Sequence, residues 1–359
     1  MAKPAAPDAD PAESFRKALL DWYDGCRRDL PWRSSTEFYP VWISEIMLQQ
    51  TRVEAATPHY LRFLARFPSV AALATAAEPD VLAAWSGLGY YSRARNLHRA
   101  AKRIAREGIP ADYDGILALP GAGPYTAAAV ASIVFGQACA AVDGNVIRVV
   151  SRLTDDDCPS ESPAARRRFG AVAEGLLDRS RAGDFNQAMM ELGATVCVPR
   201  SPRCGCCPVA EMCAARRSGR AAVLPVRAIR KEPRDRTLDL LLLGRGPGEI
   251  FLILRGGQES RLAGFWEPPV RTSANDRGAR MAAEFRHRIV NDRILVRVWI
   301  RAAFPDEGVP AETEAGAGRW FGLHDLGAIP LGGIARKAVA AAWPGLAGLL
   351  PIPGFAREV

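Results

Sequence analysis

The chain has 359 residues, which is enough for two domains of about 150 residues each. Lysine and arginine number 47 against 39 aspartates and glutamates, and the net charge of +8 favours a polyanionic partner such as nucleic acid. No run approaches about 20 apolar residues and residues 1–13 lack an apolar core, so we expect neither a membrane span nor a signal peptide.

Residues 13–217 have the pattern of a helical domain. Ala- and Leu-rich segments alternate with Gly, Pro and Ser, and apolar residues recur at three- and four-residue spacing. The charged segment 218–236 contains prolines and predicts an interdomain linker. Short β-rich runs and then helical segments follow, so we expect an α+β second domain at 237–359.

The segment 41–53 predicts an amphipathic helix that carries Glu45. Its apolar neighbours in the sequence are Ile43, Ile46, Met47 and Leu48. Glutamates in helices are most often exposed, which is the structural alternative for this residue. Burial among these neighbours would instead raise the pKa of Glu45 and keep it protonated near neutral pH, which makes it a candidate general acid.

The segment 119–127, LPGAGPYTA, lies between two predicted helices. Gly121 and Gly123 permit a tight turn and let a phosphate approach the backbone N–H groups. The helix that begins near Pro124 points its positive end at that phosphate. A G-x-G turn is usually just a loop, but Asp143 stands twenty residues beyond Gly123. This pattern resembles the helix-hairpin-helix glycosylase superfamily, which implies that the turn binds the DNA backbone and that Asp143 is a catalytic carboxylate.

Four cysteines follow a C-x6-C-x2-C-x5-C spacing. They are Cys197, Cys204, Cys207 and Cys213. Four thiolates at this spacing can converge on one soft metal centre. Tetrahedral zinc is the alternative, but zinc ribbons pair two C-x2-C hairpins and only one is present here. We predict an iron–sulfur cluster with Cys206 outside the ligand set. The remaining cysteines form no paired framework, so we expect a reducing cytoplasm.

Several motifs occur in the order found in adenine DNA glycosylases of the MutY family, in the helix-hairpin-helix, endonuclease III-like superfamily. They are LPWR (30–33), WISEIMLQQT (42–51), WSGLGYYSRARNL (85–97), VDGNV (142–146), FNQAMMELGA (185–194) and the cysteine loop 197–213. The resemblance implies a mainly helical glycosylase domain with a [4Fe-4S] cluster. It also implies double-stranded DNA with adenine opposite 8-oxoguanine or guanine as the partner, and a monomer in the cytoplasm, associated with the nucleoid.

The resemblance assigns roles to single residues. Glu45 would protonate N7 of adenine, and Asp143 would stabilise the oxocarbenium-like sugar or capture it briefly. Tyr125 and Asn145 would hold the reacting groups. The adenine pocket would be lined by Trp32, Arg33 and Gln187, and the vacated stack and the opposite base would be contacted by Gln50, Thr51, Leu88 and Tyr90. Core packing is the alternative for Leu88 and Tyr90, although Gly87 and Gly89 favour an exposed loop.

The residue after the glycine turn also separates reaction types. The bifunctional endonuclease III branch reads LPGVGRKTA, so its lysine aligns with Tyr125. Without an amine no Schiff base forms, so the resemblance implies a monofunctional enzyme that leaves the DNA backbone intact. Two rivals are a glycosylase for thymine or oxidised pyrimidines on the same fold, and a catalytically silent DNA-binding module.

AGFWEPP (263–269) resembles the C-terminal domain of the same family, which is related to Nudix folds. The REx2EE glutamates of Nudix enzymes are absent, and only ARMAAEF (279–285) stands near their place, so we expect no metal-dependent pyrophosphate hydrolysis. Many relatives contact 8-oxoguanine with an FSH triplet, and Ile289, Val290 and Asn291 stand there in this chain. Because hydrogen-bonding groups are lost, we predict that the preference for 8-oxoguanine over guanine is reduced or is supplied by other residues, with Asn291 as a partial substitute.

Overall fold

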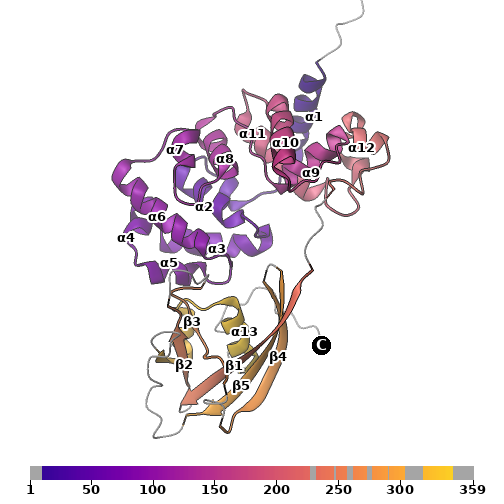
Figure 1. The fold of residues 1–359 in the computed structure, drawn as a ribbon. Helices are drawn as coiled ribbons and strands as arrows, with labels where there is room; N and C mark the ends of the chain where they lie inside the picture. The colour runs from indigo at the N-terminus through magenta and orange to yellow at the C-terminus, as the bar shows by residue number, and fades with distance from the viewer. Residues whose placement is uncertain are drawn as a thin grey trace, which may run out of the picture. The chain divides into compact units, whose positions relative to one another are not determined.

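The computed structural model describes residues 10–226, 232–245, 248–256, 262–272, 277–289, 291–303 and 318–342. The chain divides into two compact units (Figure 1). The first unit comprises Met1–Gln49 and Arg106–Arg230, and the second comprises Gln50–Ala105 and Lys231–Val359. Helix α6 spans the boundary between them.

The described part of the first unit is helical. Its elements are α1 (Pro11–Cys26), η1 (Pro31–Arg33), α2 (Phe38–Leu48), α7 (Tyr113–Leu117), α8 (Pro124–Phe135), α9 (Gly144–Thr154), α10 (Pro163–Leu176), α11 (Ala182–Thr195), η2 (Cys204–Cys206), η3 (Ala210–Met212) and α12 (Ala214–Arg217). Local sequence explains several of their ends. Helix α1 starts where Asp10 accepts a hydrogen bond from the N–H of Ala12, and α8 ends at Gly136 in a left-handed conformation.

The core of this unit lies between α1, α9, α10 and α11. Phe15 and Tyr23 of α1 pack with Phe169 of α10, and Phe185 and Leu192 of α11 complete the layer. All five side chains are at most 2% exposed. This packing fixes α9 and α11, which carry residues of the candidate site.

Helix α2 differs from its prediction in two respects. The predicted helix ran to residue 53, but α2 ends at Leu48 and the next helix starts at Val53. Between the two helices, Gln50 has a positive φ of 55°, and a right-handed helix cannot continue through a residue in this conformation. The helix is also not amphipathic, because every residue from 41 to 47 is buried. Glu45 therefore lies in a helix segment that is buried on every face.

The second unit combines four helices from the middle of the sequence with a sheet from its end. The helices are α3 (Val53–Arg66), α4 (Val70–Thr75), α5 (Glu78–Trp85) and α6 (Ser92–Glu107). The strands are β1 (Arg234–Arg245), β2 (Glu249–Leu254), β3 (Trp266–Glu267), β4 (Arg280–Ile289), β5 (Asp292–Ala302) and β6 (Gly318–Gly322), followed by η4 (Leu323–Gly327) and α13 (Gly333–Ala342). Strand β1 begins inside the segment that the sequence suggested as a linker.

The strand order is β3-β2-β1-β5-β4, and β6 also pairs with β2 (Figure 1). Strands β1 and β5 are parallel, and the other pairs are antiparallel. Side chains alternate along β1, so Leu240 and Leu242 pack with Val339 of α13 while Leu241 and Leu243 face the other side. The α+β prediction for the C-terminal part is confirmed. The segment 279–285 contributes to strand β4, not to a helix.

Within the described residues, no helix combines the length and the apolar composition that a bilayer crossing requires.

Candidate active site

Glu45 is a buried acid of the first unit's candidate site. It lies on α2 and its residue is 5% exposed. The hydroxyl of Tyr125, near the start of α8, donates a hydrogen bond of 2.7 Å to Oε2 of Glu45. The pKa of Glu45 is raised from 4.5 to about 7, because burial and the charge of Asp143 outweigh the opposing effects of the Tyr125 hydrogen bond and Arg33. Near neutral pH this carboxyl therefore exists in both protonated and ionised forms.

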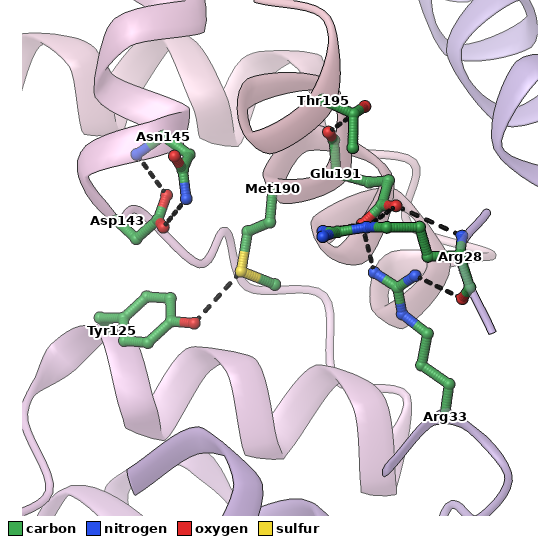
Figure 2. A network of polar contacts seen from close by, with 8 residues as sticks. All are labelled: Arg28, Arg33, Tyr125, Asp143, Asn145, Met190, Glu191 and Thr195. Carbon is green, nitrogen blue, oxygen red and sulfur yellow. Dashed lines mark hydrogen bonds and ion pairs between the residues drawn. The ribbon is translucent and has the colours of Figure 1, made fainter. Parts of the chain in front are cut away.

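Asp143 caps the N-terminus of α9. Its Oδ1 accepts hydrogen bonds from the N–H groups of Asn145 at 2.8 Å and Val146 at 2.7 Å. Its Oδ2 accepts a third, at 2.7 Å, from Nδ2 of Asn145 (Figure 2). Burial raises the pKa of Asp143, and these hydrogen bonds with Val146 and Asn145 oppose the rise. The cap leaves the side chain in one orientation beside the helix N-terminus, where negative charge is favoured.

A buried arginine connects this cap to the cysteine loop. Nη2 of Arg148 donates to Oδ1 of Asn145 at 2.8 Å and to the carbonyl of Gly193 at 2.7 Å. Its Nε donates to the carbonyl of Cys197 at 2.7 Å. A Cβ added at Gly193 would lie 2.6 Å from Cβ of Asn145. Helices α9 and α11 thus approach so closely at Asn145 that only glycine fits at residue 193.

The loop that leads to Asp143 is held by Asn186 of α11, which is 2% exposed. Its Nδ2 donates to Oγ of Ser132 and to the carbonyl of Cys139, both at 2.9 Å. Its Oδ1 accepts from the N–H of Ala141, also at 2.9 Å. A residue distant in sequence therefore positions the segment that carries Asp143.

Helix α11 adds two residues that the sequence reasoning did not single out (Figure 2). Met190 points at Tyr125, and the Tyr125 hydroxyl lies 3.1 Å from its sulfur. Glu191 is 2% exposed and binds Nε of Arg28 at 2.6 Å and Nη2 of Arg33 at 2.8 Å. Burial raises the pKa of Glu191, but the hydrogen bonds of Arg28 and Arg33 outweigh it and lower the pKa below its usual value. The feature that marks Glu191 is its burial between two guanidinium groups. This feature is visible only in the folded chain, so the sequence could not show it.

The three residues predicted for the adenine pocket have different surroundings. Trp32 is buried at 7% exposure in η1. The guanidinium of Arg33 donates hydrogen bonds to Glu191 and, at 3.0 Å, to the carbonyl of Arg28. Gln187 is partly buried on α11, one helical turn before Met190. Arg33 therefore supports α11, and Gln187 shares a helix face with the residue that contacts Tyr125.

The glycine turn has the predicted shape. Gly121 has a positive φ of 82°, which glycine adopts without strain, and Gly123 is the N-cap of α8 with Pro124 in the first turn. The N–H of Ala122 bonds to the carbonyl of Leu119 at 3.1 Å. Helices α7 and α8 flank the turn, so Gly121 and Gly123 lie in the hairpin between two helices. Nε2 of Gln49 donates to Oγ1 of Thr126 at 2.9 Å and ties α2 to α8.

In the second unit, Gly87–Tyr90 forms the turn between α5 and α6, and we name it the wedge loop. Gly87, Gly89 and Tyr90 have positive φ angles of 104°, 70° and 47°. Tyr90 is 50% exposed, whereas Leu88 is 8% exposed. Of the two predicted stacking residues, Tyr90 can meet a partner without rearrangement, and Leu88 packs inside the protein.

Arg93 of α6 holds the wedge loop from inside. Its Nη2 donates to the carbonyls of Leu88 at 3.2 Å and Gly89 at 3.3 Å, and to Oγ1 of Thr51 at 3.1 Å. Its guanidinium lies 5.7 Å from the centre of the Tyr90 ring. Burial lowers the pKa of Arg93 to about 10, still well above neutral pH. Arg93 thus joins the segment of Gln50 and Thr51 to the wedge loop.

The four cysteines predicted as ligands are all partly buried, and Cys206 is exposed. The pKa of Cys207 is raised to about 11, mainly by burial and in part by the charges of the three other predicted ligands, so these thiols are neighbours. Nη1 of Arg152 donates to Sγ of Cys197 at 3.2 Å. Within the part of the chain that the structure describes, no three His, Cys, Asp or Glu side chains are placed to hold a metal ion. The donor set is thus four neighbouring thiols with an arginine beside one of them.

The predicted opposite-base segment lies where β4 turns into β5. Ile289 ends β4 and is partly buried, Asn291 is exposed, and Val290 lies outside the described residues. The carbonyl of Asn291 accepts from the N–H of Arg234 at 2.8 Å. A hollow of about 690 Å³ adjoins this turn. It is lined by Asp235, Arg236, Thr237, Arg286, His287, Arg288, Arg293, Ile294 and Leu295, so most of its charged groups are arginines.

Known proteins similar to this chain repair DNA. Residues 43–168 match the family of HhH-GPD superfamily base excision DNA repair proteins. Adenine DNA glycosylase from Rattus norvegicus is 43% identical over 227 residues, which are 59% of this chain and 44% of that protein. A solved thermostable thymine-DNA glycosylase has a TM-score of 0.53 at 27% identity, covering 58% of this chain and 97% of that one.

The chain spans about half the length of the curated animal, plant and yeast relatives that it matches. A bacterial relative is covered more fully. Adenine DNA glycosylase from Mycolicibacterium smegmatis is 42% identical over 233 residues, which are 62% of this chain and 78% of that protein. The chain belongs to the adenine DNA glycosylase family, because it is similar to this relative and has a helical HhH-GPD domain followed by an α+β sheet domain.

Proposed function

We propose that this protein excises adenine from mispaired DNA by general-acid catalysis, with Glu45 as the acid. The observation that carries the proposal is the buried Glu45 carboxyl, with a pKa of about 7 and a hydrogen bond from Tyr125. A general acid works best when its pKa lies near the operating pH. Relatives named adenine DNA glycosylase support the choice of base.

In this mechanism the protonated Glu45 gives its proton to N7 of the flipped adenine. The protonated base carries positive charge and leaves with the electrons of the glycosidic bond. Tyr125 stays a neutral donor throughout, because burial raises the pKa of its hydroxyl well above the usual value. Its hydrogen bond stabilises the carboxylate that remains on Glu45 after proton transfer.

Asp143 then faces the positive charge that develops on the sugar. The three hydrogen bonds from Asn145 and Val146 favour the ionised form of Asp143 and hold its side chain in one orientation. A preorganised carboxylate stabilises an oxocarbenium-like transition state without reorganising. The two carboxyls differ because hydrogen bonds favour the charged form of Asp143, whereas burial favours the protonated form of Glu45.

Water then adds to the sugar cation and loses a proton, and the reaction should stop at this abasic site. Strand cleavage by a bifunctional glycosylase needs an amine nucleophile. In the segments 10–49 and 106–226 the sequence has one lysine, Lys17, and it is exposed on α1 and paired with Asp21. Tyr125 occupies the position that a catalytic lysine would take. The monofunctional assignment rests on a tyrosine, which cannot form a Schiff base, at position 125.

DNA would be held at several places. The backbone N–H groups around Gly121 and Gly123 would bind a phosphate, and Tyr90 of the wedge loop would enter the stack that the adenine leaves. The turn at Ile289 and Asn291 would face the opposite base, and the arginines of the neighbouring hollow would hold its backbone. Since Ile289 offers no hydrogen bond from its side chain, we propose a reduced preference for 8-oxoguanine over guanine.

The cysteine loop would hold a [4Fe-4S] cluster through Cys197, Cys204, Cys207 and Cys213. Four cysteine thiolates are the ligand set that such a cluster takes, and these four residues would supply it. When bound, the cluster would shape the loop for contact with DNA. Arg152 would donate a hydrogen bond to the first ligand.

Single-turnover base release tests the proposal. Duplexes with adenine opposite 8-oxoguanine, guanine, cytosine or thymine are incubated with excess enzyme, and the strand is analysed with and without alkali. We expect adenine release opposite 8-oxoguanine and guanine, with strand breaks only after alkali. Strand cleavage without alkali would refute the monofunctional mechanism, and an absence of adenine release would refute the substrate.

A thymine-specific enzyme is the second candidate, because a solved thymine-DNA glycosylase is 27% identical to this chain. A duplex with a G:T mispair, run in the same assay, separates the two. Thymine release that is faster than adenine release would favour this alternative.

A further inference from the structure

The wedge loop is anchored at both ends to the C-terminal sheet part of the second unit. At its start, Ser86 donates from Oγ to the carbonyl of Leu331 at 2.7 Å. The same oxygen accepts from Nε of Arg336, on α13, at 2.8 Å. Ser86 is 3% exposed and Arg336 is 4% exposed. Residues about 250 positions apart in sequence therefore meet directly before Gly87.

The other end of the wedge loop has its own anchor. Tyr91 follows Tyr90 directly, is 7% exposed, and has its ring centre 4.0 Å from that of Phe265. One turn into α6, the guanidinium of Arg95 donates to the carbonyl of Ala263. Burial raises the pKa of Tyr91, and the positive charge of Arg336 lies close enough to oppose this rise. Both anchors thus belong to one buried contact.

Burying the charged side chain of Arg336 at this position costs free energy. In the described residues its Nε bonds to the Ser86 hydroxyl and, at 3.4 Å, to the Leu331 carbonyl, both of them neutral groups. Burial lowers the pKa of Arg336, as expected for a cation that has lost water without gaining a carboxylate. Apolar side chains of similar size often replace such buried charges without loss of stability. The stability of the fold alone does not account for an arginine here.

The wedge loop needs support from outside its own backbone. Tyr90 has a positive φ, which is unfavourable for a residue other than glycine. Gly87 packs directly on the buried His59, because an added Cβ would lie 3.2 Å from Cε1 of that ring. Pushing a base out of the stack costs a few kcal/mol, so the residue that replaces it has to be held firmly.

We propose that Arg336 is a positioning residue for base extrusion, acting through Ser86 on the wedge loop. The C-terminal sheet part of the second unit then has a second role besides facing the opposite base. It fixes Tyr90 in the position from which its ring can replace the flipped adenine in the stack. This inference rests on the proposed glycosylase function, and it concerns a step before any bond is broken.

The first test compares wild type with Arg336→Met, which keeps the length of the side chain and removes the guanidinium. The substrate is a duplex with adenine opposite 8-oxoguanine and 2-aminopurine beside the adenine, whose fluorescence rises when it unstacks. We expect the unstacking signal and the single-turnover rate of adenine release both to fall about tenfold. The melting temperature should stay the same or rise, since a buried unpaired charge is removed.

Two further variants separate positioning from a general structural defect. Ser86→Ala removes the shared hydroxyl and should lower the unstacking signal in the same direction. Arg245→Met removes an arginine that is paired with Glu249 on the same sheet, and it should leave unstacking and release unchanged. A loss that is equal in Arg245→Met would overturn the specific role of Arg336.

A double-variant cycle gives the decisive readout. Tyr90→Asn removes the ring but tolerates the positive φ. If Arg336 acts through the wedge loop, Arg336→Met should cause no further loss in the Tyr90→Asn background. Losses that multiply in the double variant would overturn the proposal. Because 2-aminopurine reports unstacking without cleavage, wild type that unstacks DNA but releases no adenine would count against the proposed function and not against the role of Arg336.

Discussion

The Tyr125 hydroxyl lies 2.7 Å from Oε2 of Glu45, and the same hydroxyl lies 3.1 Å from the sulfur of Met190. Tyr125 therefore joins α2, which carries the acid, to α11, which packs against the helix that Asp143 caps. Through the first of these contacts it lowers the pKa that burial raises.

Glu45→Gln should lower the single-turnover rate of adenine release by about 10²- to 10⁴-fold, because the amide cannot give a proton to N7. Binding of the mispaired duplex should change little, since the side chain keeps its size and its place. Gel-shift titration and single-turnover release measure the two properties. Glu54→Gln, on an exposed glutamate of α3, is the matched control. Release at the wild-type rate would remove Glu45 from the mechanism.

Tyr125→Phe should move the alkaline limb of the pH–rate profile to higher pH. The hydrogen bond from Tyr125 stabilises ionised Glu45, so its loss raises the pKa of Glu45 above the wild-type value of about 7. Adenine release therefore persists to higher pH even where the maximal rate falls. Profiles of the single-turnover rate, with the duplex at saturation, show the shift. An alkaline limb at unchanged or lower pH would contradict the assignment.

Glu45 should also make the fold less stable as the pH rises. Its pKa is raised from 4.5 to about 7, so the folded chain holds this proton more tightly than the unfolded chain. The contribution of Glu45 to the free energy of unfolding is complete below the unfolded pKa and is lost as the pH rises through about 7. Between about pH 5 and about pH 8, the melting temperature of Glu45→Gln should fall less than that of wild type. Parallel curves for the two proteins would show that burial does not shift this pKa.

Gly193→Ala should lower both stability and activity. The added Cβ would lie 2.6 Å from Cβ of Asn145, so α9 and Asp143 have to move. Overpacking of this kind costs about 1–3 kcal/mol. Gly170→Ala is the control, because a Cβ there meets no atom within 4 Å and the helical residue gains about 0.5–1 kcal/mol. Thermal unfolding and single-turnover release are measured together, and equal behaviour of the two variants would disprove the close approach.

Cys207→Ser and Cys206→Ser should differ in their visible spectra. Cys207 is partly buried among the other predicted ligands, whereas Cys206 is exposed. Replacing a ligand should abolish the absorbance of an iron–sulfur cluster and lower the iron content, and replacing Cys206 should change neither. The opposite result would exchange the two cysteines in the ligand set. A colourless wild type containing zinc would replace the cluster with a structural zinc site.

Local sequence patterns were enough to predict the parts of the site that short-range chemistry builds. Gly121, Gly123 and Pro124 encode a turn and a helix start within a few residues, and Asp143 directly precedes the helix that it caps. The apolar neighbours of Glu45 indicated its burial. They did not show that α2 stops at Leu48, because the turn at Gln50 depends on the backbone that packs around it.

The tertiary structure decided which distant groups support these residues. Arg28 and Glu191 are 163 positions apart and form an ion pair, and Ser86 and Arg336 are 250 positions apart and share a hydrogen bond. Nothing in the residues around Glu191 or Arg336 distinguishes them from ordinary surface charges, which is how most such side chains occur. Their roles arise only when folding buries them, because a charge that leaves water has to find its partner among the groups that packing brings near.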